Sequence, residues 1–284
     1  MADLGNMFRY IVECIPPGVS CACGSNRGKK RANNEDNFCF DGTCLPEDGS
    51  IEGVVITTKI SRLNLAEGNP HGFGIFDGMG GGDYGEVASR TAARAMKEFL
   101  EQAVEESFEG TETDEEEENR QLLSFCEEAN QKVHRIGADL GSPMMGTTLA
   151  VLYLKKNSLW VCNIGDSRIF RLRDHLMEQV SVDHTDEKEM KAAGISGRKP
   201  VLTQYVGIDP EVYVLEPYIS WKKIRKKDVY LICSDGVTDM VPESDIREIL
   251  DSQMKPKGMV EKLIHSALDG GGRDNITATV LVFG

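Results

Sequence analysis

Strand-like segments in the second half of this chain follow one another through turns too short to hold a crossover helix. The apolar runs 147–154, 159–164 and 168–172 are separated only by residues 155–158 and 165–167. Parallel neighbours need connections of a dozen or more residues, so these segments are predicted to form an antiparallel meander. Helical segments are grouped before the meander and do not alternate with its strands. This order favours an α+β fold, and we expect a layered sandwich.

Two long segments, 85–108 and 119–140, have the apolar spacing of amphipathic helices, and their narrow, alanine-containing stripes suit close packing. The stripes comprise Ala88, Ala92, Ala95, Phe99 and Ala103 in the first, and Leu122, Cys126, Ala129, Val133 and Ile136 in the second. Shorter helices are predicted at 243–254 and 258–268, and further strands at 37–40, 53–60, 72–76, 229–233 and 276–283. No internal repeat or Pro/Gly/Ser-rich linker divides the chain, so we expect one domain spanning 1–284.

Composition narrows the class of protein. The chain has 284 residues, of which 40% are hydrophobic and 27% charged, as in a globular protein with a substantial core. No apolar stretch approaches the roughly 20 residues of a membrane-spanning helix, and residues 1–14 do not resemble a signal peptide. The sequence therefore predicts a cytoplasmic protein without a membrane partner.

The formal net charge of −14 is concentrated in one acidic run, residues 101–118, which holds ten acids and no base. We interpret this run as a solvated loop joining two helices, with a surface for a basic partner as the alternative. The basic clusters 29–31 and 222–227 are too short to offset it. Because nucleic acids require extended basic surfaces, a nucleic-acid partner is not expected.

The eight cysteines lack zinc-ligand spacing, because Cys21 and Cys23 are separated by one residue and no second pair matches them. We interpret them mainly as packing thiols in a reduced compartment. A redox role for Cys21 and Cys23 is the alternative, and no other sequence feature supports it.

Acidic residues in turns at strand ends carry the chemistry that the sequence suggests. Asp77-Gly78 follows the apolar run 72–76, and its carboxylate and nearby backbone carbonyl are the ligands that a hard dication prefers. Comparable acids in Gly-, Asn- or Ser-flanked turns are Glu35, Asp36, Asp166, Asp235 and Asp274. Any one of them can be a turn former. Together they would repel one another without a cation, and an all-oxygen set favours magnesium or manganese.

Residues 80–85 also match the dinucleotide-binding pattern G-x-G-x-x-G, between a strand candidate and a helix candidate. However, the acids some 20 residues further on lie on a helix and its acidic loop, whereas the ribose-binding carboxylate belongs at the end of a second strand. Asp77 would also repel a pyrophosphate unless a cation intervened. A dinucleotide-binding oxidoreductase is therefore a minor alternative.

Short motifs in register extend over nearly the whole chain. They are Gly28-x-x-Arg31-x-x-Asn34-Glu35-Asp36, Phe76-Asp77-Gly78-Met79-Gly80-Gly81 with Gly85-Glu86, Gly146-Thr147-Thr148, Gly165-Asp166-Ser167-Arg168, Asp183-His184, Leu202-Thr203-Gln204, Cys233-Ser234-Asp235-Gly236 and Asp274-Asn275-Ile276-Thr277. In this combination the chain resembles metal-dependent protein Ser/Thr phosphatases of the type 2C family, in their bacterial form. The resemblance implies a four-layer αββα sandwich of two antiparallel sheets flanked by helix pairs, with the site at one end.

The resemblance also implies a mechanism. Asp77, the Gly78 carbonyl, Asp235 and Asp274 would bind two Mn²⁺ or Mg²⁺ ions, and Glu35 and Asp36 would hold metal-bound waters. Arg31 would bind the phosphate through its planar fork of donors. A hydroxide formed at the two ions would attack phosphoserine or phosphothreonine. Asp166 is interpreted either as part of a third metal site or as a structural turn.

Some positions depart from the family pattern. Met79 and Gly82 stand where relatives carry histidines, so the general acid is not identified. The segment 186–200 corresponds to a short flap beside the site, while 41–70 and 109–118 resemble loop insertions. His184 is expected to brace a turn, not to catalyse. The expected partners are phosphoproteins and a cognate Ser/Thr kinase; a catalytically silent interaction protein with the same fold is the rival hypothesis.

Overall fold

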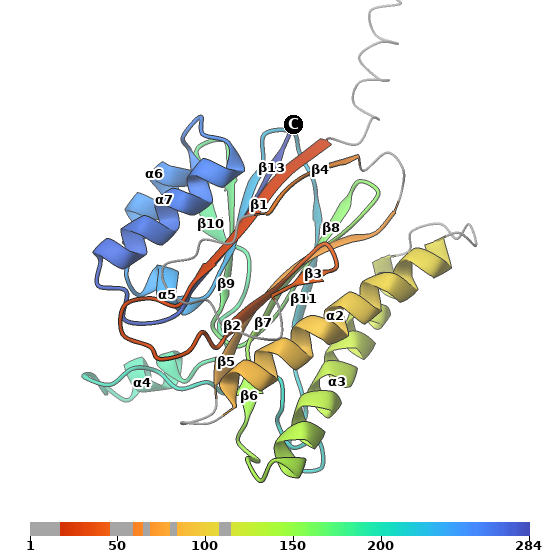
Figure 1. Cartoon of the computed structure of the whole chain (residues 1–284), viewed down its shortest axis with the longest axis vertical. Coiled ribbons are helices and arrows are strands. Elements are labelled where there is room, and N and C mark those ends of the chain that lie inside the picture. Colours follow the sequence, from red (N-terminus) through yellow and green to blue (C-terminus); the bar gives the residue numbers. More distant parts are fainter. Residues whose placement is uncertain (1–17, 46–58, 65–68, 80–83, 108–114) are drawn as a thin grey trace, which may run out of the picture.

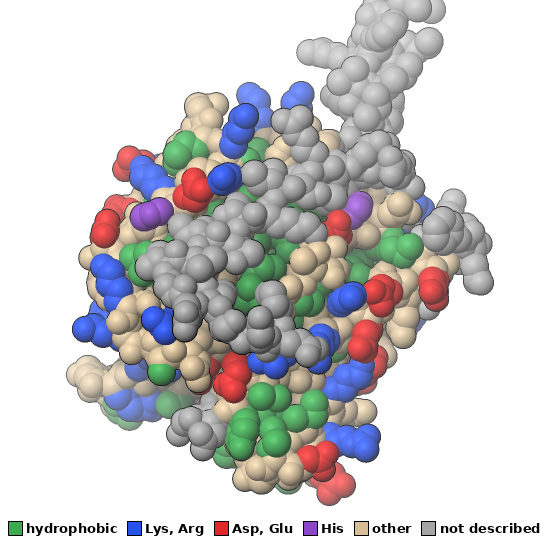
Figure 2. Space-filling view, in the orientation of Figure 1, with side chains coloured by type: hydrophobic (Ala, Val, Ile, Leu, Met, Phe, Trp, Pro, Cys, Tyr) green, Lys and Arg blue, Asp and Glu red, His purple; other side chains and the backbone are tan. Residues whose placement is uncertain are grey.

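The computed structural model describes residues 18–45, 59–64, 69–79, 84–107 and 115–284. Its centre consists of two antiparallel β-sheets stacked face to face, with one helix pair on each outer face (Figure 1). The predicted α+β, four-layer αββα sandwich is therefore confirmed. Figure 2 shows acidic and basic side chains interleaved over one face of the molecule.

The first sheet has six strands in the order β10-β9-β12-β13-β1-β4. Its strands are β1 (Gly18–Asn26), β4 (Lys59–Asn64), β9 (Arg168–Arg173), β10 (Leu176–Gln179), β12 (Val229–Cys233) and β13 (Ile276–Phe283). The outer face of this sheet is covered by α6 (Glu243–Leu250) and α7 (Pro256–Asp269). Residues such as Leu263 and Val280 are fully buried between the helices and the strands.

The second sheet has the order β11-β8-β7-β5-β2-β3, with β6 paired to β5. Its strands are β2 (Asp36–Phe40), β3 (Thr43–Cys44), β5 (His71–Met79), β6 (Gly146–Thr147), β7 (Leu149–Lys155), β8 (Ser158–Ile164) and β11 (Tyr218–Lys223). The long helices α2 (Gly85–Ser107) and α3 (Glu115–Asp139) pack on its outer face. The predicted meander is confirmed for β7 and β8, which pair antiparallel. It is wrong for β9, which belongs to the other sheet and pairs with β10 and β12.

The predicted solvated loop 101–118 is wrong at both of its described ends, because residues 101–107 belong to α2 and α3 begins at Glu115. The last acids of the predicted insertion 109–118 therefore form a first helical turn. Four glutamates there suit the positive end of the helix dipole. Residues 41–70, predicted to be a loop insertion, contain β3 and β4 in their described part. That part is therefore not a simple loop.

None of the seven described cysteines is in a disulfide, and six of them are buried, as expected for packing residues. Burial raises the pKa of Cys23 to about 12, which argues against the suggested redox role for Cys21 and Cys23. The eighth, Cys14, lies outside the described residues. None of the described helices combines the length and apolarity needed to cross a bilayer.

Candidate active site

The centre of the site is a pair of carboxylates on neighbouring strands. Asp36 begins β2 and Asp77 lies near the end of β5, and the two residues are directly opposite each other in the antiparallel register. Opposite residues point to the same face of a sheet, so the two acids are neighbours. Repulsion from Asp36 adds to burial, the larger cause, in raising the pKa of Asp77.

Gly78 is required by close backbone packing at the end of β5. A Cβ atom at this position would lie 2.1 Å from the carbonyl oxygen of Gly85 and 2.7 Å from that of Glu35. The Gly78 amide donates to the Glu35 carbonyl at 3.1 Å. Only glycine lets these three chain segments approach this closely.

Asp36 is a buried acid with one carboxylate oxygen bonded and the other without a protein partner. The hydroxyls of Ser234 and Thr277 donate to its Oδ2 at 2.8 and 2.7 Å, while Oδ1 has no hydrogen-bond partner. Burial raises the pKa of Asp36 to about 7, against the effect of these two hydrogen bonds. A buried carboxylate oxygen without a partner suits an additional ligand, such as a cation or ordered water.

Asp235 and Asp274 come from the first sheet. Asp235 follows β12 as the first residue of the short helix α5 (Asp235–Thr238), and Asp274 lies in the turn just before β13. The Oδ1 atom of Asp235 has no partner, and Oδ1 of Asp274 accepts the amide of Asn275 at 2.8 Å. The amide oxygen of Asn275 in turn accepts the backbone N–H of Glu35 at 2.8 Å, which links the two loops.

Arg31 connects the acids of the two sheets. Its Nη2 donates to Asp274 Oδ2 at 2.7 Å, and Nη1 donates to Glu35 Oε2 at 3.2 Å. The bond to Asp274 is the main reason that the pKa of Arg31 is raised. The side chain remains 45% exposed, so its guanidinium can reach a ligand entering from solvent.

Seven of the eight predicted site residues line one cavity of about 800 Å³. They are Arg31, Glu35, Asp77, Gly78, Asp166, Asp235 and Asp274. The eighth, Asp36, lies behind the cavity wall beside Asp77. Met79 also lines the cavity, whereas Gly82 and most of the glycine pattern 80–85 lie outside the described residues.

The donor set fits a divalent cation bound by oxygen. Burial and like-charged neighbours both raise the pKa of Asp77, so the negative charge of the clustered carboxylates is not fully compensated by the protein. In the described part of the chain, however, no three His, Cys, Asp or Glu side chains already enclose an ion position. Arg31 and Lys199 hold some of the carboxylate oxygens, and those carboxylates would turn toward a bound cation.

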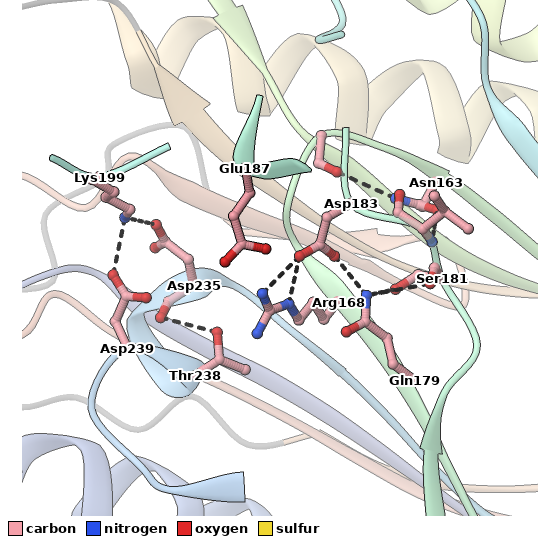
Figure 3. A network of polar contacts seen from close by, with 12 residues as sticks. Asn163, Arg168, Gln179, Ser181, Asp183, Glu187, Lys199, Asp235, Thr238 and Asp239 are labelled. Atoms are coloured by element: carbon pink, nitrogen blue, oxygen red, sulfur yellow. Dashed lines mark hydrogen bonds and ion pairs between the residues drawn. The ribbon is translucent and has the colours of Figure 1, made fainter. Parts of the chain in front are cut away.

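The flap contributes residues that the sequence analysis missed. Lys199 donates to Asp235 Oδ2 at 2.5 Å and to Asp239 Oδ2 at 3.0 Å (Figure 3). The segment 186–200 contains α4 (Glu187–Ala192) and reaches the cavity through Lys199 and Pro200. The sequence contained one signal for this contact: the basic pair Arg198-Lys199 lies in the segment that was predicted to border the site.

The turn at Gly165-Asp166 is supported by a network beside the cavity. His184 Nδ1 accepts the amide of Gly165 at 3.2 Å, so this histidine braces the turn as predicted. Arg168 donates two hydrogen bonds to Asp183 Oδ2 in the same network (Figure 3). Burial, followed by repulsion from Asp235, raises the pKa of Asp166 to about 6. These features are compatible with both interpretations of Asp166.

Comparison with known proteins identifies the class to which this sandwich and its acidic cavity belong. The family model described as protein phosphatase 2C matches residues 69–268. Protein phosphatase PhpP of Streptococcus pneumoniae is 32% identical over 216 residues, 73% of this chain and 83% of that protein. The serine/threonine phosphatase stp of Listeria monocytogenes is 30% identical over 270 residues, 90% of this chain and 93% of that protein.

A solved structure has the same fold and holds metal. The catalytic domain of the phosphatase PstP, in complex with two manganese ions, matches with a TM-score of 0.65 and 27% identity over 94% of this chain and 99% of that one. The chain thus belongs to the protein phosphatase 2C family. Its enzyme class is protein serine/threonine phosphatase.

Proposed function

We propose that this enzyme removes phosphate from phosphoserine and phosphothreonine in proteins by metal-dependent hydrolysis at the cavity described above. The observation that carries the proposal is the gathering of Asp77 and Asp274, almost 200 residues apart in sequence, around one cavity with Arg31. Asp77, the Gly78 carbonyl, Asp235 and Asp274 would hold two Mn²⁺ or Mg²⁺ ions. Asp166 and Asp235 would hold a third.

The bound ions would supply Lewis acidity, which offsets charge on the phosphoryl oxygens and lets water act as a hydroxide nucleophile near neutral pH. The protein's residues position the reactants. Asp36 and Glu35 offer acceptor oxygens that orient water, and the unpartnered Oδ1 of Asp36 is suited to this role. Arg31 presents a donor fork to the phosphate, and its contacts with Glu35 and Asp274 fix the direction of that fork.

Met79 cannot donate a proton to the leaving alkoxide, although it lines the cavity. Proton delivery by water is therefore our proposal for the second half of the reaction. No covalent enzyme intermediate is needed, because bound ions would activate water directly.

The test is hydrolysis of a chromogenic aryl phosphate and of a phosphothreonine peptide, with manganese and with a chelator. We expect manganese-dependent turnover that falls at least about 100-fold in Asp77→Asn, because this residue lies at the centre of the ligand set. Asp174→Asn is the matched control, since Asp174 is an exposed acid in the turn between β9 and β10. Turnover that survives chelation would exclude the metal mechanism.

We further propose that the physiological substrates are phosphoproteins made by a cognate Ser/Thr kinase. Relatives named serine/threonine phosphatase support this substrate class. The rival hypothesis, a silent interaction protein, predicts phosphopeptide or protein binding without release of phosphate. Measuring phosphate released from the autophosphorylated kinase distinguishes the two hypotheses.

A further inference from the structure

Two cysteines face each other on the hairpin formed by β2 and β3, away from the phosphatase cavity. Cys39 and Cys44 are opposite partners in the antiparallel register, one pair before the turn. The turn residues Asp41 and Gly42 have φ of 49° and 78°, the positive values of a two-residue type I′ hairpin. The hairpin lies beside α2, which packs on the same sheet (Figure 1).

The hydrogen-bond pattern shows which kind of cross-strand pair the cysteines form. The backbone amide of Asp41 donates to the Gly72 carbonyl at 2.8 Å. Because backbone groups alternate in direction along a strand, the N–H and C=O groups of the odd-numbered residues of β2 face β5, on the side opposite β3. The backbone of Cys39 is thus directed away from β3, and Cys39 and Cys44 form a non-hydrogen-bonded pair.

This kind of pair suits a disulfide. Its Cα atoms are typically about 4.5 Å apart, which falls within the range of about 4.4–6.8 Å found across disulfides. The two thiols already form a side-chain hydrogen bond. Oxidation would therefore join groups that are in contact, without a change of strand register.

The two thiols differ in accessibility and in the direction of their pKa shifts. Cys39 is only 1% exposed, whereas Cys44 is half-buried and its thiol donates a hydrogen bond to the Ala93 carbonyl of α2 at 3.4 Å. The hydrogen bond from Cys39 lowers the pKa of Cys44, assisted by the positive charges of Lys97 and Arg94 against the effect of burial. A half-buried thiol stabilised as thiolate is the more reactive member of the pair.

We propose that Cys39 and Cys44 form a peroxide-sensitive dithiol site, in which Cys44 reacts first and Cys39 resolves. The Cys44 thiolate attacks hydrogen peroxide, taking one oxygen as a sulfenic acid while the released hydroxide gains a proton and leaves as water. The Cys39 sulfur then displaces that hydroxyl group as a second water. Two thiols and one peroxide give one disulfide and two waters. The inference does not depend on the proposed phosphatase mechanism.

The sequence provides a direct assay. Trypsin cleaves after Arg31 and Lys59, and the peptide 32–59 contains Cys39 and Cys44 and no other cysteine. The full-length protein is treated with hydrogen peroxide, quenched, unfolded, alkylated and digested. We expect this peptide to lose both alkylation sites and two hydrogens, and to regain both sites after dithiothreitol.

The peptides 121–132 and 157–168 are internal controls, since each carries a single buried cysteine, Cys126 or Cys162. The hydrogen bond with the neighbouring thiol Cys162, followed by burial, raises the pKa of Cys126. We expect both peptides to be oxidised at least about tenfold more slowly than 32–59. Equal rates would mean unselective oxidation and would overturn the proposal.

Two nearly isosteric variants assign the roles. Cys39→Ser is expected to stop at a sulfenic acid on Cys44, which dimedone traps. Cys44→Ser is expected to leave Cys39 reduced at the same peroxide dose. Wild-type peptide that keeps two alkylatable thiols, or oxidation of Cys39 in Cys44→Ser at the wild-type rate, would refute the proposal.

Discussion

Arg31 is held between two carboxylates, so its guanidinium has a fixed orientation although the side chain is partly exposed. We expect Arg31→Lys to keep the positive charge but lose the forked geometry, so that kcat/KM for a phosphopeptide falls roughly 10- to 100-fold, mainly through KM. The exposed neighbour Lys30 gives the control, Lys30→Ala, with nearly unchanged kinetics. Equal losses in the two variants would point to general electrostatic attraction.

The hydroxyl of Thr277 stabilises the charged form of Asp36 inside the protein. In Thr277→Val the shape is kept, but this bond and the hydrogen bond with the Ser25 hydroxyl at 2.8 Å are lost, so we expect a loss of about 1–3 kcal/mol in the free energy of unfolding at pH 7.5. Thr91→Val removes a hydroxyl that bonds a neutral carbonyl on α2, and should cost less. Denaturant unfolding of both variants measures the difference; equal values would contradict a special role of the Asp36 contact.

The junction between β5 and α2 depends on one residue without a side chain. Gly78→Ala would force a Cβ atom to within 2.1 Å of the Gly85 carbonyl, so the strand end and the helix start must separate. We expect a loss of more than about 2 kcal/mol of stability together with loss of activity. Gly258→Ala on α7 is the control, since its nearest neighbour would lie at 3.6 Å and alanine favours a helix. Thermal melts of the two variants should shift in opposite directions.

The elements that sequence patterns predicted well are those with strong apolar periodicity, such as α2, β7 and β8. The strand β1 was missed because its sequence, rich in Cys, Ser and Gly, has one β-branched residue, Val19, and no aromatic residue to mark a strand. The β2–β3 hairpin was missed although Asp41-Gly42 is a typical type I′ turn. The acids of the site were found because each of them lies close to the start or the end of a strand that the sequence pattern predicts.

Lys199 could not have been assigned in the same way. Its role depends on where a flap with little regular structure places an ammonium group, and neither periodicity nor spacing encodes that position. That acids from two sheets meet at one site likewise could not be predicted from local sequence patterns. Asp77 belongs to one sheet, while Asp235 and Asp274 adjoin strands of the other. The sequence supplied the residue types, and the sandwich supplied their proximity.

The gathering of acids makes the stability of the whole protein depend on pH and metal. The pKa values of Asp36 and Asp166 are raised to about 7 and about 6, and that of Asp77 is also raised. Each group binds protons more tightly in the folded state, so its stabilising effect is complete below its unfolded pKa near 4 and is lost as the pH rises through the folded value. His184, whose pKa is lowered by burial, acts in the opposite direction below about pH 6.5.

We therefore expect the metal-free protein to melt at a higher temperature at pH 5.5 than at pH 7.5, by on the order of 5 °C. Manganese should raise the melting temperature at pH 7.5 because it replaces protons in offsetting the carboxylate repulsion. In Asp77→Asn both effects should shrink, since one of the repelling charges is gone, whereas Asp174→Asn should behave like the wild type. Differential scanning calorimetry of chelated and manganese-loaded protein checks both effects. A metal-free protein that melts lower at pH 5.5 would show that the acids are not strained by their proximity.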